Sequence, residues 1–142
     1  MNGTVHVKNI GLRGVTVADT KISFIDGEQG LLMYRGYRIE ELAQYSSFME
    51  TAYLLLQGAL PDMKELEAFS RQVVEARQVP GFLYESFYRW PREAHPMEVL
   101  QASIPMLAMA DPDLSGETRE ANVRKAIRLI ALLPGIVAAW HR

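Results

Sequence analysis

Prolines and glycines divide most of this chain into segments that are each about one helix long. Gly58 and Pro61 close one segment, Pro80 closes the next, and Pro91 and Pro96 flank a short connection. Because proline lacks the backbone N–H and clashes with the preceding turn, we expect helices to end near these residues. The chain is thereby limited to several helices of moderate length joined by short connections.

Apolar side chains recur at helical spacing between these breaks. Ser47 followed by Glu50 has the spacing of a capping box, and Pro96 suits the first position of a helix. Thr118 opens the last helix without a clean capping box. The pattern predicts helices over about residues 39–43, 48–57, 62–78, 82–88, 96–110 and 118–140.

The region before the helices has a different pattern. Residues 20–25 alternate polar and apolar side chains, residues 31–36 are β-prone, and a glycine-rich turn separates the two runs. This arrangement predicts a β-hairpin. Residues 1–10 show no long periodic run, and we expect a flexible arm there. The predicted fold class is therefore mainly α, a helical array with a short N-terminal hairpin.

Composition excludes several kinds of protein. Of the 142 residues, 49% are hydrophobic and 23% charged, which is typical of a globular domain. The formal net charge of −2 does not suit a nucleic-acid-binding protein, and the absence of cysteine excludes disulfides and thiolate metal sites. Residues 129–140 form the longest apolar run, which is too short to span a bilayer. We expect a cytoplasmic protein that binds neither nucleic acid nor membrane.

The three histidines are the first candidates for acid–base chemistry. His6 lies in the predicted arm and His141 next to the last residue, so neither is predicted to be catalytic. His95 precedes Pro96 at a predicted helix start, where its ring can accept a hydrogen bond from a first-turn N–H. We predict this capping role for His95 rather than catalysis.

Other polar motifs have structural interpretations as well. Asp111 and Asp113 suit the turn that ends a helix, and no second set of ligands predicts a metal. Gly27 and Gly30 suit a hairpin turn better than a phosphate loop. Arg35 and Arg38 could hold an anion, but solvated or ion-paired arginines are more common.

Large apolar side chains are interpreted as core. This group comprises the aromatic series Tyr53, Phe69, Phe82, Phe87, Tyr88 and Trp90, and the methionines Met97, Met106 and Met109. We therefore predict no catalytic, substrate-binding, cofactor-binding or metal-binding residue in this chain.

Several motifs nonetheless carry a resemblance to a known family. In order and spacing, they resemble the N-terminal region of citrate synthases and 2-methylcitrate synthases, from about Gly11 onward. The motifs are GLRGV at residues 11–15, TKISFIDGEQG at 20–30, YRGYRIEELA at 34–43, SSF at 46–48, AYLLLQG at 52–58, LP at 60–61, AHPMEVL at 94–100 and LPGIVAA at 133–139.

The resemblance implies a place within a larger enzyme. Residues 11–142 would form the N-terminal portion of the large domain of a mostly helical homodimer. Enzymes of this family are acyltransferases of the tricarboxylic acid cycle that condense acetyl-CoA with oxaloacetate to citrate and CoA. Their catalytic His and Asp and their substrate-binding Arg residues come from later in the chain. None can be carried onto this sequence, because the family's His-Pro-Met motif around His95 is not catalytic.

These implications leave some alternatives open. Residues 138–142 continue a helical pattern without a stop signal, so we expect the chain to be a piece of a longer protein. It would then be inactive alone and bind no cofactor, with acetyl-CoA as substrate of the complete enzyme. Its partner would be a second copy or the remaining chain. The alternatives are a 2-methylcitrate synthase that uses propionyl-CoA, and a non-catalytic helical interaction module.

Overall fold

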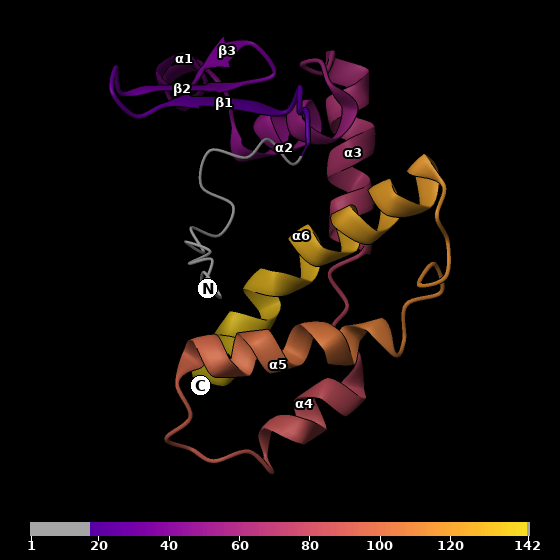
Figure 1. Ribbon diagram of the computed structural model, residues 1–142. Helices are drawn as coiled ribbons and strands as arrows, with labels where there is room; N and C mark the ends of the chain where they lie inside the picture. The colour runs from indigo at the N-terminus through magenta and orange to yellow at the C-terminus, as the bar shows by residue number, and fades with distance from the viewer. Residues whose placement is uncertain (1–17, 142) are drawn as a thin grey trace, which may run out of the picture. The chain divides into compact units, whose positions relative to one another are not determined.

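The computed structural model describes residues 18–141, which form three short strands and six helices (Figure 1). The predicted class, mainly helical with an N-terminal hairpin, is confirmed. The predicted arm of residues 1–10 lies outside the described residues. The chain falls into two compact units that meet at Tyr45 and Ser46, and each is considered by itself.

The first unit contains a small antiparallel sheet in the order β1-β2-β3. Strands β1 (Ser23–Asp26) and β2 (Leu31–Tyr34) form the predicted hairpin, with Phe24 opposite Met33. The Asp26 carboxylate closes the intervening turn, because its Oδ1 accepts the N–H groups of Glu28 and Gln29, each at 3.0 Å. This side-chain bonding gives the glycine-rich turn a defined conformation.

Strand β3 (Tyr37–Arg38) was not predicted. It pairs with β2 through a two-residue turn in which Arg35 and Gly36 both have positive φ, 50° and 91°. Such a turn usually carries Asn or Asp before the glycine, so an arginine there gives little sequence signal. Helix α1 (Ile39–Tyr45) follows at once and buries Leu42.

The second unit is entirely helical. Its first helix, α2 (Phe48–Gln57), begins with the predicted capping box: Ser47 Oγ accepts the Glu50 N–H at 3.2 Å, and Glu50 Oε2 accepts the Ser47 N–H at 2.7 Å. Gly58 ends it in the left-handed conformation, with φ 99°. The remaining helices are α3 (Met63–Glu75), α4 (Gly81–Phe87), α5 (Pro96–Ala108) and α6 (Arg119–His141).

Two helices end earlier than predicted. Helix α3 stops at Glu75 rather than Gln78, since Val79 precedes a proline, turns away and is buried. Helix α5 stops at Ala108, because the next N–H groups bond three residues back: Met109 to Met106 and Ala110 to Leu107, both at 3.1 Å. These tighter turns satisfy the last carbonyls and close the helix before Asp111.

Helix α6 is the longest element and belongs to two apolar cores. One core joins it to α2 and α3 and contains Ala52, Phe69, Val73, Ile127 and Ala131. The other joins it to α4, α5 and the preceding connection and contains Val79, Leu83, Leu107, Leu132 and Ile136. In Figure 1 α3 lies beside the first half of α6, and α5 lies beside its second half. No helix within residues 18–141 is long and apolar enough to cross a bilayer.

The left-handed end of α2 provides a test of this architecture. Replacing Gly58 by alanine forces a Cβ into the φ 99° conformation, which should lower the free energy of unfolding by about 1 kcal/mol. Gly81→Ala is the matched control, because that glycine has no positive φ and open space around its Cβ position. Urea unfolding followed by circular dichroism measures both. Equal midpoints for the two variants would contradict the assigned helix end.

Candidate functional site

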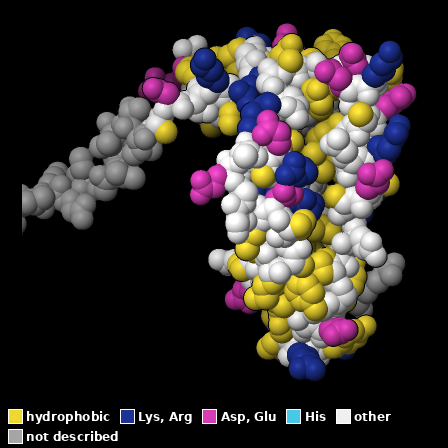
Figure 2. All heavy atoms as spheres, turned by 90° about the vertical axis from the view of Figure 1, so that its right-hand side faces the viewer, with side chains coloured by type: hydrophobic (Ala, Val, Ile, Leu, Met, Phe, Trp, Pro, Cys, Tyr) yellow, Lys and Arg dark blue, Asp and Glu magenta, His cyan; other side chains and the backbone are white. Residues whose placement is uncertain are grey.

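A groove of about 940 Å³ in the helical unit is bordered mainly by α3, α5 and α6. Apolar side chains of α5 and α6 line it, including Leu107 and Ile127, and charged side chains stand beside them. In Figure 2 hydrophobic side chains gather in the lower part of the molecule, and charged side chains crowd the region above. The groove is the first place to look for chemistry, because ligand sites are usually concave and apolar with a few polar groups.

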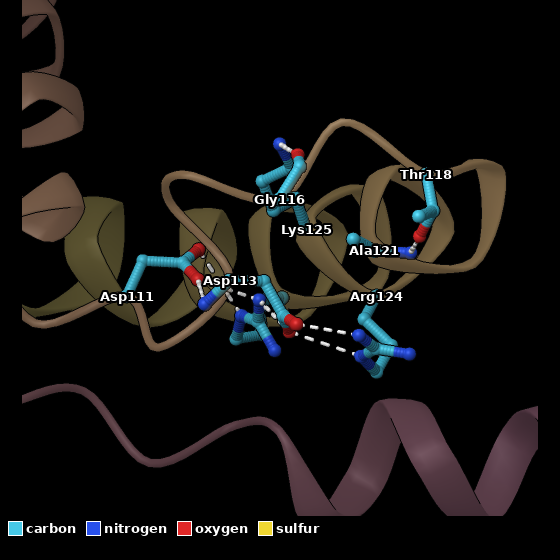
Figure 3. A network of polar contacts seen from close by, with 8 residues as sticks. Asp111, Asp113, Gly116, Thr118, Ala121, Arg124 and Lys125 are labelled. Atoms are coloured by element: carbon cyan, nitrogen blue, oxygen red, sulfur yellow. Dashed lines mark hydrogen bonds and ion pairs between the residues drawn. The ribbon is translucent and has the colours of Figure 1, made fainter.

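The charged groups beside the groove are tied together. Arg128 Nη2 lies 2.6 Å from Asp111 Oδ1 and 2.7 Å from Asp113 Oδ2, and Arg124 Nη2 lies 2.5 Å from Asp113 Oδ1. Figure 3 shows the Asp113 carboxylate directed toward Arg124, with Asp111 on its other side. We call Asp111, Asp113, Arg124 and Arg128 the Asp–Arg cluster.

The ion pairs of the cluster favour the charged states of Asp113 and Arg124. Hydrogen bonds from Arg124 and then from Arg128 hold the pKa of Asp113 well below its usual range. The hydrogen bond to Asp113 raises the pKa of Arg124 in return. The lowered pKa makes the Asp113 carboxylate a weak base, and the raised pKa makes the Arg124 guanidinium a very weak acid, so neither is well matched to proton transfer near neutral pH. Asp113 and Arg124 are therefore suited to holding structure rather than to acid–base chemistry.

The backbone around the cluster is held by further bonds. Lys125 Nζ donates to the Gly116 carbonyl at 2.8 Å, and Thr118 Oγ1 accepts the Ala121 N–H at 3.2 Å as a simple cap of α6. A Cβ on Gly116 would lie 2.8 Å from the Cβ of Ala121, so only glycine fits there. These contacts join the connection between α5 and α6, residues 109–118, to the first turns of α6. We call this connection the α5–α6 loop.

His95 has the predicted capping role. Its Nδ1 accepts the Met97 N–H at 3.2 Å, and Glu98 Oε2 accepts the His95 N–H at 3.0 Å, which completes a capping box. One ring nitrogen is thus engaged by the backbone of α5. His141 is exposed in the last turn of α6, and His6 lies outside the described residues.

The remaining polar candidates do not assemble into a site. Arg38 makes an exposed ion pair with Glu40, with 3.7 Å between Nε and Oε2, so one of the two arginines considered for an anion is paired. Within residues 18–141 no group of three acidic, histidine or cysteine side chains could hold a metal ion.

Part of the apolar prediction is wrong. Tyr53 packs edge-on against Phe69, and Phe87 contacts Trp90 and Trp140, as expected of core aromatic residues. Tyr88, in contrast, is 84% exposed, and Phe82, Met97 and Met109 are also exposed. Residues at helix ends lose the regular relation between spacing and burial, which explains these errors.

The Asp–Arg cluster was missed by sequence reasoning, although its signal was present. Arg124 and Arg128 are four residues apart, so they share one face of α6. Asp111 and Asp113 come shortly before that helix, in a turn that can fold back against it. Each pair was interpretable alone as a turn or as a solvated face, and only the return of the loop joins them.

Comparisons with known proteins identify the relatives of this chain. A family model described as "Citrate synthase, C-terminal domain" matches residues 11–142. The citrate synthase of Synechocystis sp. is 38% identical over 131 residues, 92% of this chain and 33% of that protein. The crystal structure of citrate synthase from Pyrobaculum aerophilum has a TM-score of 0.85 and 35% identity, covering 99% of this chain and 40% of that one.

A third relative was solved with ligands. It is the citrate synthase of Thermoplasma acidophilum in ternary complex with carboxymethyl coenzyme A and oxaloacetate, with a TM-score of 0.84 and 25% identity. The match covers 91% of this chain and 34% of that one. The chain spans about a third of the length of the curated relatives that it matches.

Acid should weaken the α5–α6 region through Asp113. The pKa of an aspartate in an unfolded chain is about 3.9, whereas the pKa of Asp113 in the folded chain is lower. Below that pH the unfolded state takes up a proton first, so the stability that Asp113 provides is present above about pH 4 and is lost on further acidification. Urea midpoints between pH 7 and pH 3 should fall more steeply for the native sequence than for Asp113→Asn.

The control for this titration is Glu117→Gln. It removes one exposed carboxylate from the same loop without touching either arginine of the cluster. Its pH dependence should match that of the native sequence. Parallel curves for the native sequence and Asp113→Asn would show that the cluster does not couple folding to protonation.

Proposed function

Because this chain belongs to the citrate synthase family, we propose that it forms the N-terminal third of an enzyme that condenses acetyl-CoA with oxaloacetate to citrate and CoA. The family match over residues 11–142 carries this proposal. The relative solved with carboxymethyl coenzyme A and oxaloacetate supports the choice of substrates. The matching family model is named for a C-terminal domain, so our placement in the N-terminal part of the large domain rests on the order of the sequence motifs.

We propose that the 142-residue chain has no condensing activity alone. The condensation needs a base to remove a proton from the thioester and donors to stabilise the developing charge. Among the described residues, His95 caps a helix and Asp113 is held ionised by arginines. Acetyl-CoA is then a substrate of the complete enzyme, and we expect no bound cofactor in this part.

We favour acetyl-CoA over propionyl-CoA as the substrate of the complete enzyme. The three relatives described above are named citrate synthases, and the carboxymethyl group of the bound analogue has two carbons, as acetyl has. Rates of the complete enzyme with the two thioesters decide between them.

An acyltransferase with these substrates would act in the tricarboxylic acid cycle, and we propose a cytoplasmic location.

Association with further protein is the second part of the proposal. From Leu129 to Trp140 helix α6 carries no charge on any face, and a helix of that kind is normally buried all round. One side packs into the core through Leu132 and Ile136, whereas Leu129 and Val137 face solvent. We propose that the remaining part of the enzyme, or a second copy of the chain, covers this side.

A hybrid enzyme tests the assignment. The matching part of the Pyrobaculum aerophilum enzyme, 40% of its chain, is replaced by residues 11–142 of this chain. Because the folds agree closely, the hybrid should release CoA from acetyl-CoA in the presence of oxaloacetate, at least about tenfold above background, an easily resolved difference in rate. The isolated 142-residue chain should release none. Free CoA thiol is followed by absorbance with a thiol reagent.

The hybrid with Leu54→Asp is the control, since Leu54 is fully buried in α2 and its loss should unfold the inserted part. A hybrid that folds by circular dichroism but stays inactive would argue against the placement. Citrate formation by the isolated chain would overturn the proposed inactivity alone.

Self-association should depend on the exposed side of α6. Val137 is 53% exposed, so Val137→Glu adds a charge there at little cost to folding. Sedimentation velocity from low to high micromolar concentration should show association of the native 142-residue chain and a monomer for Val137→Glu. Glu85→Gln on α4 removes a charge elsewhere and should associate like the native chain. If the native chain stays monomeric, a second copy is excluded as the partner of this surface, and the remaining part of the enzyme is the partner that we propose.

A further inference from the structure

The α5–α6 loop is held without apolar anchoring. Of residues 109–118, all of which the structure describes, none is buried, and Leu114 is 56% exposed. Its close approach to α6 is the Gly116 backbone against Ala121. A segment with so few buried apolar contacts has low local stability unless polar contacts hold it.

Polar contacts to α6 supply that hold. Asp111 and Asp113 reach Arg128, Asp113 also reaches Arg124, and the Gly116 carbonyl accepts from Lys125. The Asp111 and Asp113 side chains are each only 17% exposed, in contrast with the exposed Arg38–Glu40 pair. Partial burial and shared, bidentate geometry make these contacts stronger than an ordinary surface pair.

The same loop forms one wall of the groove. Ala110, Asp111 and Leu114 line it on that side, while α3 and α5 line it elsewhere. We propose that the α5–α6 loop is a strap over this groove that opens as a unit while α5 and α6 stay folded, and that the Asp–Arg cluster sets how often it opens. Opening widens the groove and releases the guanidinium groups of Arg124 and Arg128 toward it.

The other charged residues around the groove do not compete with Arg124 and Arg128 for the two aspartates. Residues Arg119, Glu120 and Lys125 of α6 and Glu75 of α3 also line the groove, whereas the α5 residues that line it are uncharged. Arg119 donates to Gln57 at 3.1 Å and Lys125 donates to the Gly116 carbonyl at 2.8 Å, so both cations are engaged away from the two carboxylates. Weakening the carboxylate–guanidinium contacts should therefore act on the loop first.

Amide hydrogen exchange of the 142-residue chain, resolved by NMR, tests the strap. The Asp113, Leu114 and Gly116 N–H groups are bonded within the loop, to Asp111 Oδ1, the Asp111 carbonyl and the Asp113 carbonyl. In Asp113→Asn these amides should exchange at least about tenfold faster, whereas the amides of Leu107 and Ile127 in the cores should keep their rates. Glu117→Gln, with the same change of charge in the same loop, should behave like the native chain.

A salt series on the native sequence keeps the test independent of any variant. Raising the salt concentration to about 1 M, where the screening length falls to about 3 Å, should speed exchange of the loop amides but not of the core amides. Two results would overturn the proposal. One is an equal acceleration of loop and core amides, which means global unfolding, and the other is an unchanged loop in both Asp113→Asn and high salt.

Discussion

The packing of the helical unit depends on α6, which contributes buried side chains to both apolar cores. Ile127 and Ala131 lie four residues apart and face one core, and Leu132 and Ile136 repeat that spacing one residue later toward the other. A shift of one residue turns the side chain by about 100° around the helix, so two adjacent stripes of one helix serve two groups of partners. Helices α2 and α3 are thereby related to α4 and α5 through α6. Gly135 belongs to this arrangement, since a Cβ there would lie 3.2 Å from Val79 of the second core.

The charged residues of α6 are concentrated in its first half. Arg119, Glu120, Arg124, Lys125 and Arg128 all lie in its first ten residues, and the following stretch to Trp140 is uncharged. The charged half fixes a loop that buries none of its apolar side chains, and the apolar half supplies the buried Leu132 and Ile136. One helix thus uses ionic contacts where it meets a polar segment and apolar packing where it meets other helices.

Local chemistry explains which features were predictable. Ser47 with Glu50, Gly58 and His95 all act within a few residues of their own positions, and the structure confirms each role. Strand β3 was missed because Arg35 adopts a positive φ that arginine seldom takes. The capping box of Asp62 and Glu65 is equally local and was overlooked when α3 was placed, although its spacing is the same. The Asp–Arg cluster was out of reach for another reason: it joins residues 11 to 17 positions apart through a loop whose path no local pattern specifies.

The expectation that this part of the chain holds no catalytic residue follows from where its polar groups are used. A catalytic group needs a hydrogen-bonding position that is free for substrate, and a pKa near the working pH. In this region the ring of His95 bonds its own helix, Glu50, Glu65 and Glu98 close capping boxes, and Asp113 is kept ionised by two arginines. Groups satisfied in this way give helices defined ends and a defined loop, which is what a rigid support contributes to an active site assembled elsewhere. We expect this rigid region to change shape most easily at the groove beside the Asp–Arg cluster. The loop that borders the groove is held by ion pairs and has no buried side chain of its own.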